Sequence, residues 1–199
     1  MNDNTMQNHF PDRTYTRLTD YDYSSPGAYF VTICVYKKQC LFGSIENGTM
    51  HLNPHGEIAQ KCWLDLQNHY AGINNEFFIV MPNHVHGIVV ITNTNKRSGF
   101  KPDPTNKPIL SEIVRAFKTF SSRGINESRH SPGTTVWQRS FYEHIIRNEK
   151  NLREIGEYIA FNPAKWDNDS ENPDSLKKCF GLVGSGFRRL EAVGTQLLS

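Results

Sequence analysis

Two histidines, His84 and His86, stand at the start of an apolar, β-branched run. The segment 81–91 has the sequence Met-Pro-Asn-His-Val-His-Gly-Ile-Val-Val-Ile. This composition predicts a β-strand that begins after the Pro82-Asn83 turn. Side chains alternate between the faces of a strand, so His84 and His86 are expected on one face, opposite Val85. Inside an apolar run such imidazoles need polar partners or a ligand. The pair can hold one divalent cation, and a packing or surface role is the other interpretation.

Hydrophobic periodicity along the rest of the chain predicts a mixed α+β domain. β-branched and aromatic runs predict strands over 28–36, 77–81 and 84–92, another within 135–146, and an Asn47-Gly48 hairpin joining 42–46 to 49–52. Amphipathic spacing predicts helices over 54–70 and 109–120, and a third helix that Asn148 caps and that ends near 161, before Pro163. Residues 93–108 and 121–134 are predicted loops. Without the hairpin, this order is β-α-β-β-α-β plus one helix, a ferredoxin-like layout with one antiparallel sheet and helices on one face.

Length and composition bound the organisation of the chain. Its 199 residues fit one domain, predicted over 26–166, with a polar arm at 1–25 and an unassigned extension at 167–199. The four cysteines form no C-x-x-C pair, which argues against a zinc knuckle or a redox motif. No apolar leader or membrane-length apolar run is present, so we expect a cytoplasmic protein without a membrane partner.

Charge is distributed unevenly along the sequence. The net charge is +2, yet residues 96–153 hold 12 Lys and Arg against 5 Asp and Glu. This asymmetry predicts a polyanionic partner, with a solvated surface as the alternative. Basic, amide and aromatic side chains in this region can hold phosphates and stack bases. The candidate DNA-binding residues are Arg115, Lys118, Trp137, Gln138, Arg139 and Arg147.

The predicted helix after Asn148 carries a candidate nucleophile. Its core stripe consists of Leu152, Ile155 and Ile159, and Tyr158 lies at the edge of that stripe. Asn162 follows one turn later on the same side as Tyr158. By themselves, these residues also fit a half-buried tyrosine with a solvated hydroxyl and a helix C-cap before a proline.

Three segments in this order resemble one known family. They are residues 81–86 (Met-Pro-Asn-His-Val-His), 137–147 (Trp-Gln-Arg-Ser-Phe-Tyr-Glu-His-Ile-Ile-Arg) and 157–163 (Glu-Tyr-Ile-Ala-Phe-Asn-Pro). Together they resemble the REP-associated tyrosine transposases of the single-tyrosine HUH superfamily, across roughly residues 26–166. The resemblance implies a ferredoxin-like fold and cleavage of single-stranded DNA beside hairpins. It also implies a Mg²⁺ or Mn²⁺ site at His84 and His86, Asn162 as a third ligand and Tyr158 as the nucleophile.

The expected activity is metal-dependent nicking and joining of single-stranded or hairpin DNA in transposition, through a covalent 5′-phosphotyrosine. The resemblance favours a monomer whose tyrosine acts in cis, with a dimer as the alternative. Tyr142, in the aromatic cluster before Arg147, is the competing nucleophile. A non-catalytic hairpin-binding protein is the main rival function. A two-histidine phosphoesterase ranks lower, because that class needs two separated His-x-Ser/Thr motifs, which this chain lacks.

Overall fold

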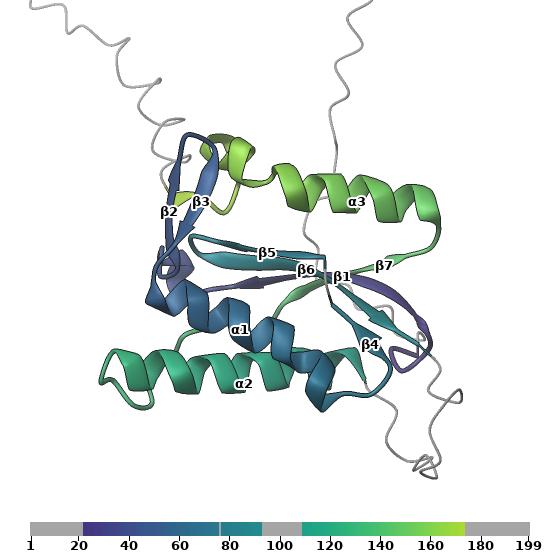
Figure 1. Ribbon diagram of the computed structural model, residues 1–199, viewed down its shortest axis with the longest axis horizontal. Helices are drawn as coiled ribbons and strands as arrows, with labels where there is room; N and C mark the ends of the chain where they lie inside the picture. The colour runs from purple at the N-terminus through teal and green to yellow at the C-terminus, as the bar shows by residue number, and fades with distance from the viewer. Residues whose placement is uncertain (1–21, 76, 93–108, 174–199) are drawn as a thin grey trace, which may run out of the picture.

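The computed structural model describes residues 22–75, 77–92 and 109–173, which form an antiparallel sheet between helices on both faces (Figure 1). Helices α1 (Pro54–His69) and α2 (Leu110–Ser128) cover one face, and α3 (Glu149–Phe161) covers the other. Most of the predicted arm, the loop at 93–108 and the extension beyond residue 173 lie outside the described residues. No helix in the described ranges is long and apolar enough to cross a membrane.

The sheet has the predicted ferredoxin-like order. The central strand β1 (Gly27–Cys34) lies between β6 (His84–Ile91) and β7 (Tyr142–Ile146). Strand β5 (Phe78–Met81) pairs with the start of β6, and the short β4 (Ile73–Asn74) pairs with its end. All these pairings are antiparallel. With α1 and α2 as the crossovers, the α+β fold class predicted from the sequence is confirmed.

A separate hairpin stands beside this sheet, formed by β2 (Gly43–Glu46) and β3 (Thr49–Leu52). Its turn residues Asn47 and Gly48 both have positive φ, 51° and 73°, as a type I′ hairpin turn requires. The predicted hairpin is therefore confirmed.

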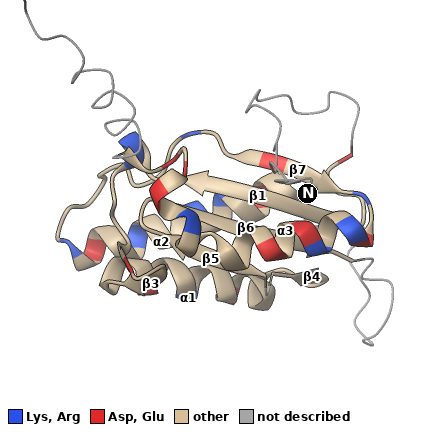
Figure 2. Ribbon diagram, turned by 90° about the horizontal axis from the view of Figure 1, so that it is seen from above, with Lys and Arg blue, Asp and Glu red and all other residues tan. Residues whose placement is uncertain are grey.

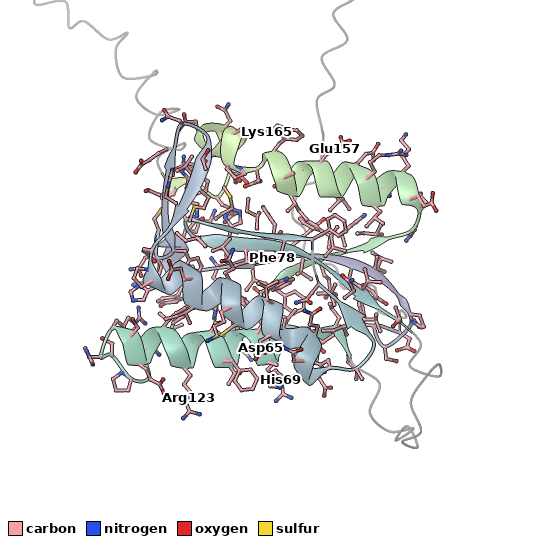
Figure 3. The ribbon with its side chains drawn as sticks, in the orientation of Figure 1. Asp65, His69, Phe78, Arg123, Glu157 and Lys165 are labelled. Atoms are coloured by element: carbon pink, nitrogen blue, oxygen red, sulfur yellow. The ribbon has the colours of Figure 1, made fainter. Side chains whose placement is uncertain are left out.

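Alternation along the strands divides the core into two layers (Figure 3). The larger layer, under α1 and α2, includes Val31, Val85, Trp63 and Phe117. Gly87 of β6 faces this layer, and a Cβ there would lie 2.2 Å from Cζ2 of Trp63. The glycine after the two histidines therefore makes room for the tryptophan of α1.

The smaller layer lies between the sheet and α3. Phe30, Ile88 and Ile146 of the sheet pack there against Ile155 and Ile159 of the helix. The even-numbered residues of β6 face this layer, which puts both histidines under α3.

Helix α2 continues to Ser128, through half of the region predicted as the loop 121–134. The buried Ser121 donates to the carbonyl of Phe117 at 2.6 Å and accepts from Nε1 of Trp137 at 2.9 Å. Asn126 Nδ2 donates to the carbonyl of Thr134 at 2.9 Å. Trp137 and Thr134 lie beyond the end of the helix in sequence, and their hydrogen bonds satisfy the buried polar side chains of Ser121 and Asn126. A local sequence pattern assigns such polar residues to a loop.

Helix α3 begins and ends where the sequence predicts. Asn148 is its N-cap and accepts from the backbone N–H of Asn151 at 2.8 Å. Although Pro163 follows, Asn162 keeps helical dihedral angles (φ −58°, ψ −42°). The chain therefore continues directly into a 3-10 helix, η2 (Pro163–Asn168), which tolerates a proline at its first position.

Candidate metal and tyrosine site

The imidazoles of His84 and His86 converge on one point beneath α3. The tight turn between β5 and β6 places both on the same face, opposite Cys34 and Thr32 of β1. Their side chains are 0% and 1% exposed. The two Nε2 atoms lie 2.9 Å apart.

Hydrogen bonds at the far side of each ring orient these nitrogens. Asn83 Nδ2 donates to the carbonyls of Lys38 at 3.0 Å and Glu171 at 2.7 Å, so its Oδ1 is the acceptor for Nδ1 of His84 at 2.9 Å. A neutral His84 therefore keeps its lone pair on Nε2. Nδ1 of His86 lies 2.9 Å from Oγ1 of Thr32, a hydroxyl that can donate or accept. The contact with Thr32 therefore holds the orientation of the His86 ring whichever of its two nitrogens carries the proton.

These residues fit a hard divalent cation. Adjacent ligands of an octahedral Mg²⁺ at about 2.1 Å are separated by about 3.0 Å, and the two Nε2 atoms lie 2.9 Å apart. A carboxylate oxygen of Asp169 lies within 4.8 Å of both ligand nitrogens. Asn162 is 2% exposed, and its Oδ1 has no hydrogen-bond partner among the described residues. Carboxylate and amide oxygens suit Mg²⁺ or Mn²⁺, whereas imidazole nitrogens also suit Zn²⁺ and other transition metals, so this group is compatible with a divalent cation.

Tyr158 reaches this point from α3. Its hydroxyl oxygen lies 3.3 Å from Nε2 of His86, and its ring packs edge-on against Phe30, with the centroids 6.0 Å apart. Tyr142 of β7 packs against the other side of this cluster, with its centroid 6.3 Å from that of Phe30. Both tyrosines therefore lie on the face that carries the histidines, and the hydroxyl of Tyr158 contacts an imidazole of the pair.

Five of the predicted DNA-binding residues line one groove of about 470 Å³ between α2 and the segment 134–141. They are Arg115, Lys118, Trp137, Gln138 and Arg139. Arg115 and Arg139 are exposed. The backbone N–H of Gln138 donates to the carbonyl of Cys34 at 2.9 Å, and Cys34 is paired with His84 across the sheet. The groove therefore lies at the same end of the sheet as the histidines, on the face that α2 covers.

Three of these five side chains are engaged within the protein. Gln138 Nε2 donates to the carbonyl of Val35 at 3.4 Å. Lys118 Nζ donates to the carbonyls of Gln138, Arg139 and Ser140 at 2.9, 3.3 and 3.0 Å, and burial lowers the pKa of Lys118 to about 8. Trp137 is 5% exposed and packs between Phe42 and Phe117. In this conformation Lys118 holds the loop, and Trp137 packs in the core rather than presenting a face for base stacking.

Arg147 lies outside the groove. It is exposed between β7 and α3, where Lys and Arg alternate with Asp and Glu (Figure 2). Burial, with a smaller contribution from the nearby Arg147 charge, lowers the pKa of His144.

Four residues of the site carry no predicted role from the sequence. Asn83 reads there as a turn residue and Thr32 as a strand residue, whereas Asp169 and Glu171 fall in the extension that begins at 167. Glu171 is 1% exposed and pairs with Lys38 at 3.3 Å. The described contacts of the site therefore include residues of the predicted extension beyond residue 166. Pro163, a residue common at a helix start, is the signal that a further turn follows α3.

Two sequence relatives and one solved structure show which proteins this chain is similar to. No family model matches the sequence. The chain is 38% identical over 168 residues to an uncharacterized protein of Haemophilus influenzae, a match that covers 79% of this chain and 91% of that protein. It is 20% identical over 144 residues to a second Haemophilus influenzae protein, a candidate REP-associated tyrosine transposase, across 72% of this chain and 74% of that one.

A solved structure of a REP-associated tyrosine transposase bound to a REP hairpin matches with a TM-score of 0.52 and 19% identity, over 94% of this chain and 99% of that chain. The chain resembles the REP-associated tyrosine transposases, whose fold it shares. The sequence relative and the three ordered motifs agree on this resemblance, and the structural match shows the common fold.

Proposed function

We propose that this chain is a REP-associated tyrosine transposase that nicks and joins single-stranded DNA beside hairpins, through a covalent 5′-phosphotyrosine on Tyr158. The observation that carries the proposal is the meeting of three side chains from two elements. The hydroxyl of Tyr158 lies 3.3 Å from Nε2 of His86, which lies 2.9 Å from Nε2 of His84. A nucleophile beside a cation site is the arrangement that phosphodiester cleavage needs.

The chain's residues account for a balanced reaction. Oη of Tyr158 attacks the scissile phosphorus and loses its proton to water, because a tyrosine with a pKa of about 10 is mostly protonated at neutral pH. The new bond joins Oη to the 5′-phosphate, and the bond from phosphorus to the 3′ oxygen breaks. The departing 3′ oxygen takes up a proton. Attack by an incoming 3′-OH on the phosphotyrosine reverses these steps, so joining needs no nucleotide energy source.

His84, His86 and Asn162 are the proposed protein ligands of Mg²⁺ or Mn²⁺. A bound cation would polarise the scissile phosphate and stabilise its developing negative charge. Asn83 and Thr32 hold the two rings in position through their Nδ1 atoms. The ring of Phe30 packs against both His86 and Tyr158, with centroid distances of 5.4 and 6.0 Å, and supports the contact between them.

The proposed DNA contacts lie in the groove beside α2, with Arg147 as a further contact near β7. Exposed guanidinium groups of Arg115 and Arg139 suit backbone phosphates. The solved relative is bound to a REP hairpin, which supports a hairpin as the ligand. The groove and the histidines share one end of the sheet, so a hairpin in the groove could extend a single strand around that end.

Substituting Tyr158 with Phe tests the proposal. The change removes one oxygen and keeps the ring against Phe30, so hairpin binding and Mn²⁺ binding should persist while cleavage and the covalent adduct disappear. Tyr142→Phe is the matched control, since it makes the same change on the same face and should still form the adduct. Denaturing gels and mass spectrometry of the adduct from a labelled hairpin oligonucleotide provide the measurement.

Each outcome decides between the candidates. An adduct on a peptide containing Tyr142, or one that Tyr158→Phe still forms, would overturn the assignment of the nucleophile. Hairpin binding without any adduct from the unsubstituted protein would favour the non-catalytic hairpin binder. Arg115→Ala and Arg139→Ala should weaken binding and reduce its salt dependence without moving the cut position.

A further inference from the structure

The segment that follows α3 is fastened across the histidine end of the sheet. Lys38 Nζ lies 3.3 Å from Oε2 of Glu171 and donates to the carbonyl of Ser170 at 3.3 Å. Cys34, which is paired with His84, donates its S–H to the same carboxylate oxygen at 3.5 Å. Figure 3 shows Lys165 on η2, the short helix that leads from α3 into this segment.

One hydrogen-bonded path runs from His84 through this segment to a carboxylate. Asn83 accepts from Nδ1 of His84 at 2.9 Å and donates to the carbonyl of Glu171 at 2.7 Å. The backbone N–H of Glu171 donates to Oδ1 of Asp169 at 2.7 Å. The residue that orients His84 therefore also fixes the backbone that holds Asp169. The path closes at the histidine pair, since one ring nitrogen of each histidine lies within 4.8 Å of a carboxylate oxygen of Asp169.

From this geometry we propose that Asp169 is a further protein ligand of the divalent cation, and that Glu171 is the residue that positions it. The inference rests on the cation site of the proposed function and adds to it a negatively charged ligand from outside α3. Two neutral imidazoles and an amide leave a divalent charge uncompensated, whereas a carboxylate neutralises part of it and is a ligand that Mg²⁺ and Mn²⁺ prefer. The second oxygen of Asp169 can serve while Oδ1 keeps its bond to Glu171.

The test is a Mn²⁺ titration of the full-length, DNA-free protein, followed by the electron paramagnetic resonance signal of free Mn²⁺. Asp169→Asn keeps an oxygen that can accept from Glu171 and removes only the charge, so the fold should persist while Mn²⁺ affinity falls at least tenfold. The matched control is Asp167→Asn, the same change at an exposed position of η2, which should leave the affinity unchanged. Glu171→Gln should weaken Mn²⁺ binding less than Asp169→Asn, by about tenfold, the lower end of the range for residues that orient ligands.

The controls separate this inference from the proposed function. If Asp169→Asn binds Mn²⁺ as the unsubstituted protein does, while His86→Gln loses affinity, Asp169 is not a ligand and the histidine site stands. If His86→Gln also binds normally, or the unsubstituted protein binds no Mn²⁺, the cation site itself is wrong. Thermal unfolding accompanies each titration, and Asp169→Ser replaces the Asn variant if that variant does not fold. Equal losses for Asp167→Asn and Asp169→Asn would assign the effect to net charge and overturn the ligand role.

Discussion

The imidazoles of His84 and His86 each pack against an aromatic ring, so their substitution needs care. His86 stacks on Phe30 with centroids 5.4 Å apart, and His84 lies 6.1 Å from the ring of Trp166. Although the strand-end position suggests that alanine would be harmless there, both rings are buried. Alanine would leave a cavity and an unpaired polar group, at a cost of about 2–3 kcal/mol.

We therefore expect glutamine to separate the chemistry from the fold better than alanine. His86→Gln keeps most of the side-chain volume and an amide that can pair with Thr32, so the protein should fold while Mn²⁺ affinity falls at least tenfold. Isothermal titration calorimetry measures the affinity. His144→Gln serves as the control on the same face of the sheet, and an unchanged affinity for His86→Gln would make this pair structural.

The lowered pKa of Lys118 predicts how the stability of the protein depends on pH. Burial lowers its pKa from 10.5 to about 8, so between these values the unfolded chain binds more protons than the folded one. The free energy of unfolding therefore increases as pH rises from about 8 toward 10. This added stability is lost as pH falls back through 8. Urea unfolding at pH 7, 8, 9 and 10 should show the native protein gaining stability relative to Lys118→Met. The other lysines and tyrosines cancel in this difference, and a difference that is constant with pH would contradict the lowered pKa.

At the scale of elements, Gly156 of α3 and Gly87 of β6 differ in the space available for a side chain. A Cβ on Gly156, in the middle of α3, meets no atom within 4 Å, whereas a Cβ on Gly87 lies 2.2 Å from Trp63. Gly156→Ala should raise the free energy of unfolding by about 0.5–1 kcal/mol, because alanine favours the helix. Gly87→Ala should lower it by about 1–3 kcal/mol through overpacking. Urea unfolding measures both, and two changes of the same sign would show that these environments are misassigned.

The elements that the sequence predicts well are those that local signals determine. The Asn47-Gly48 turn, the Asn148 cap and the alternation through His84 and His86 depend on neighbours within a few residues. The end of α2 depends instead on tertiary contacts such as that between Ser121 and Trp137. For this reason the polar sequence after residue 120 predicts a loop where a helix forms.

In the candidate site, too, some residues can be predicted from local sequence and others depend on tertiary contacts. Tyr158 and Asn162 can be inferred from helical spacing and motif resemblance, because both lie on one turn of one helix. Asp169 reaches the histidines through Asn83 and Glu171, contacts that join residues far apart in sequence. The side-chain engagement of Lys118 with three carbonyls likewise depends on where the segment 138–140 lies. No pattern in the sequence encodes such placements.

For the whole molecule, the important relation is between the two faces of the sheet. Helices α3 and α2 lie on opposite faces of the sheet (Figure 1). α3 holds the tyrosine beside the histidines, and the groove beside α2 lies at the same end of the sheet. The backbone contact of Gln138 with Cys34 links them, since Cys34 is paired with His84. A hairpin held in the groove can therefore present its flanking strand to the tyrosine only by passing around this end of the sheet.

The same arrangement predicts that one chain supplies a whole active site. Oη of Tyr158 lies 3.3 Å from Nε2 of His86 within a single chain, so no second copy is needed to bring nucleophile and histidines together. Tyr158→Phe and His86→Gln should each be inactive, and their mixture should also be inactive. Cleavage of a labelled hairpin oligonucleotide by each variant and by an equimolar mixture measures this.

If the tyrosine helix instead acted across a two-fold dimer, random pairing would restore roughly a quarter of the activity. The adduct would then lie on the His86→Gln chain, because that chain carries the intact tyrosine, and mass spectrometry would identify it there. Such restored cleavage would overturn action in cis, whereas an inactive mixture alongside an active unsubstituted protein at the same concentration supports a monomer.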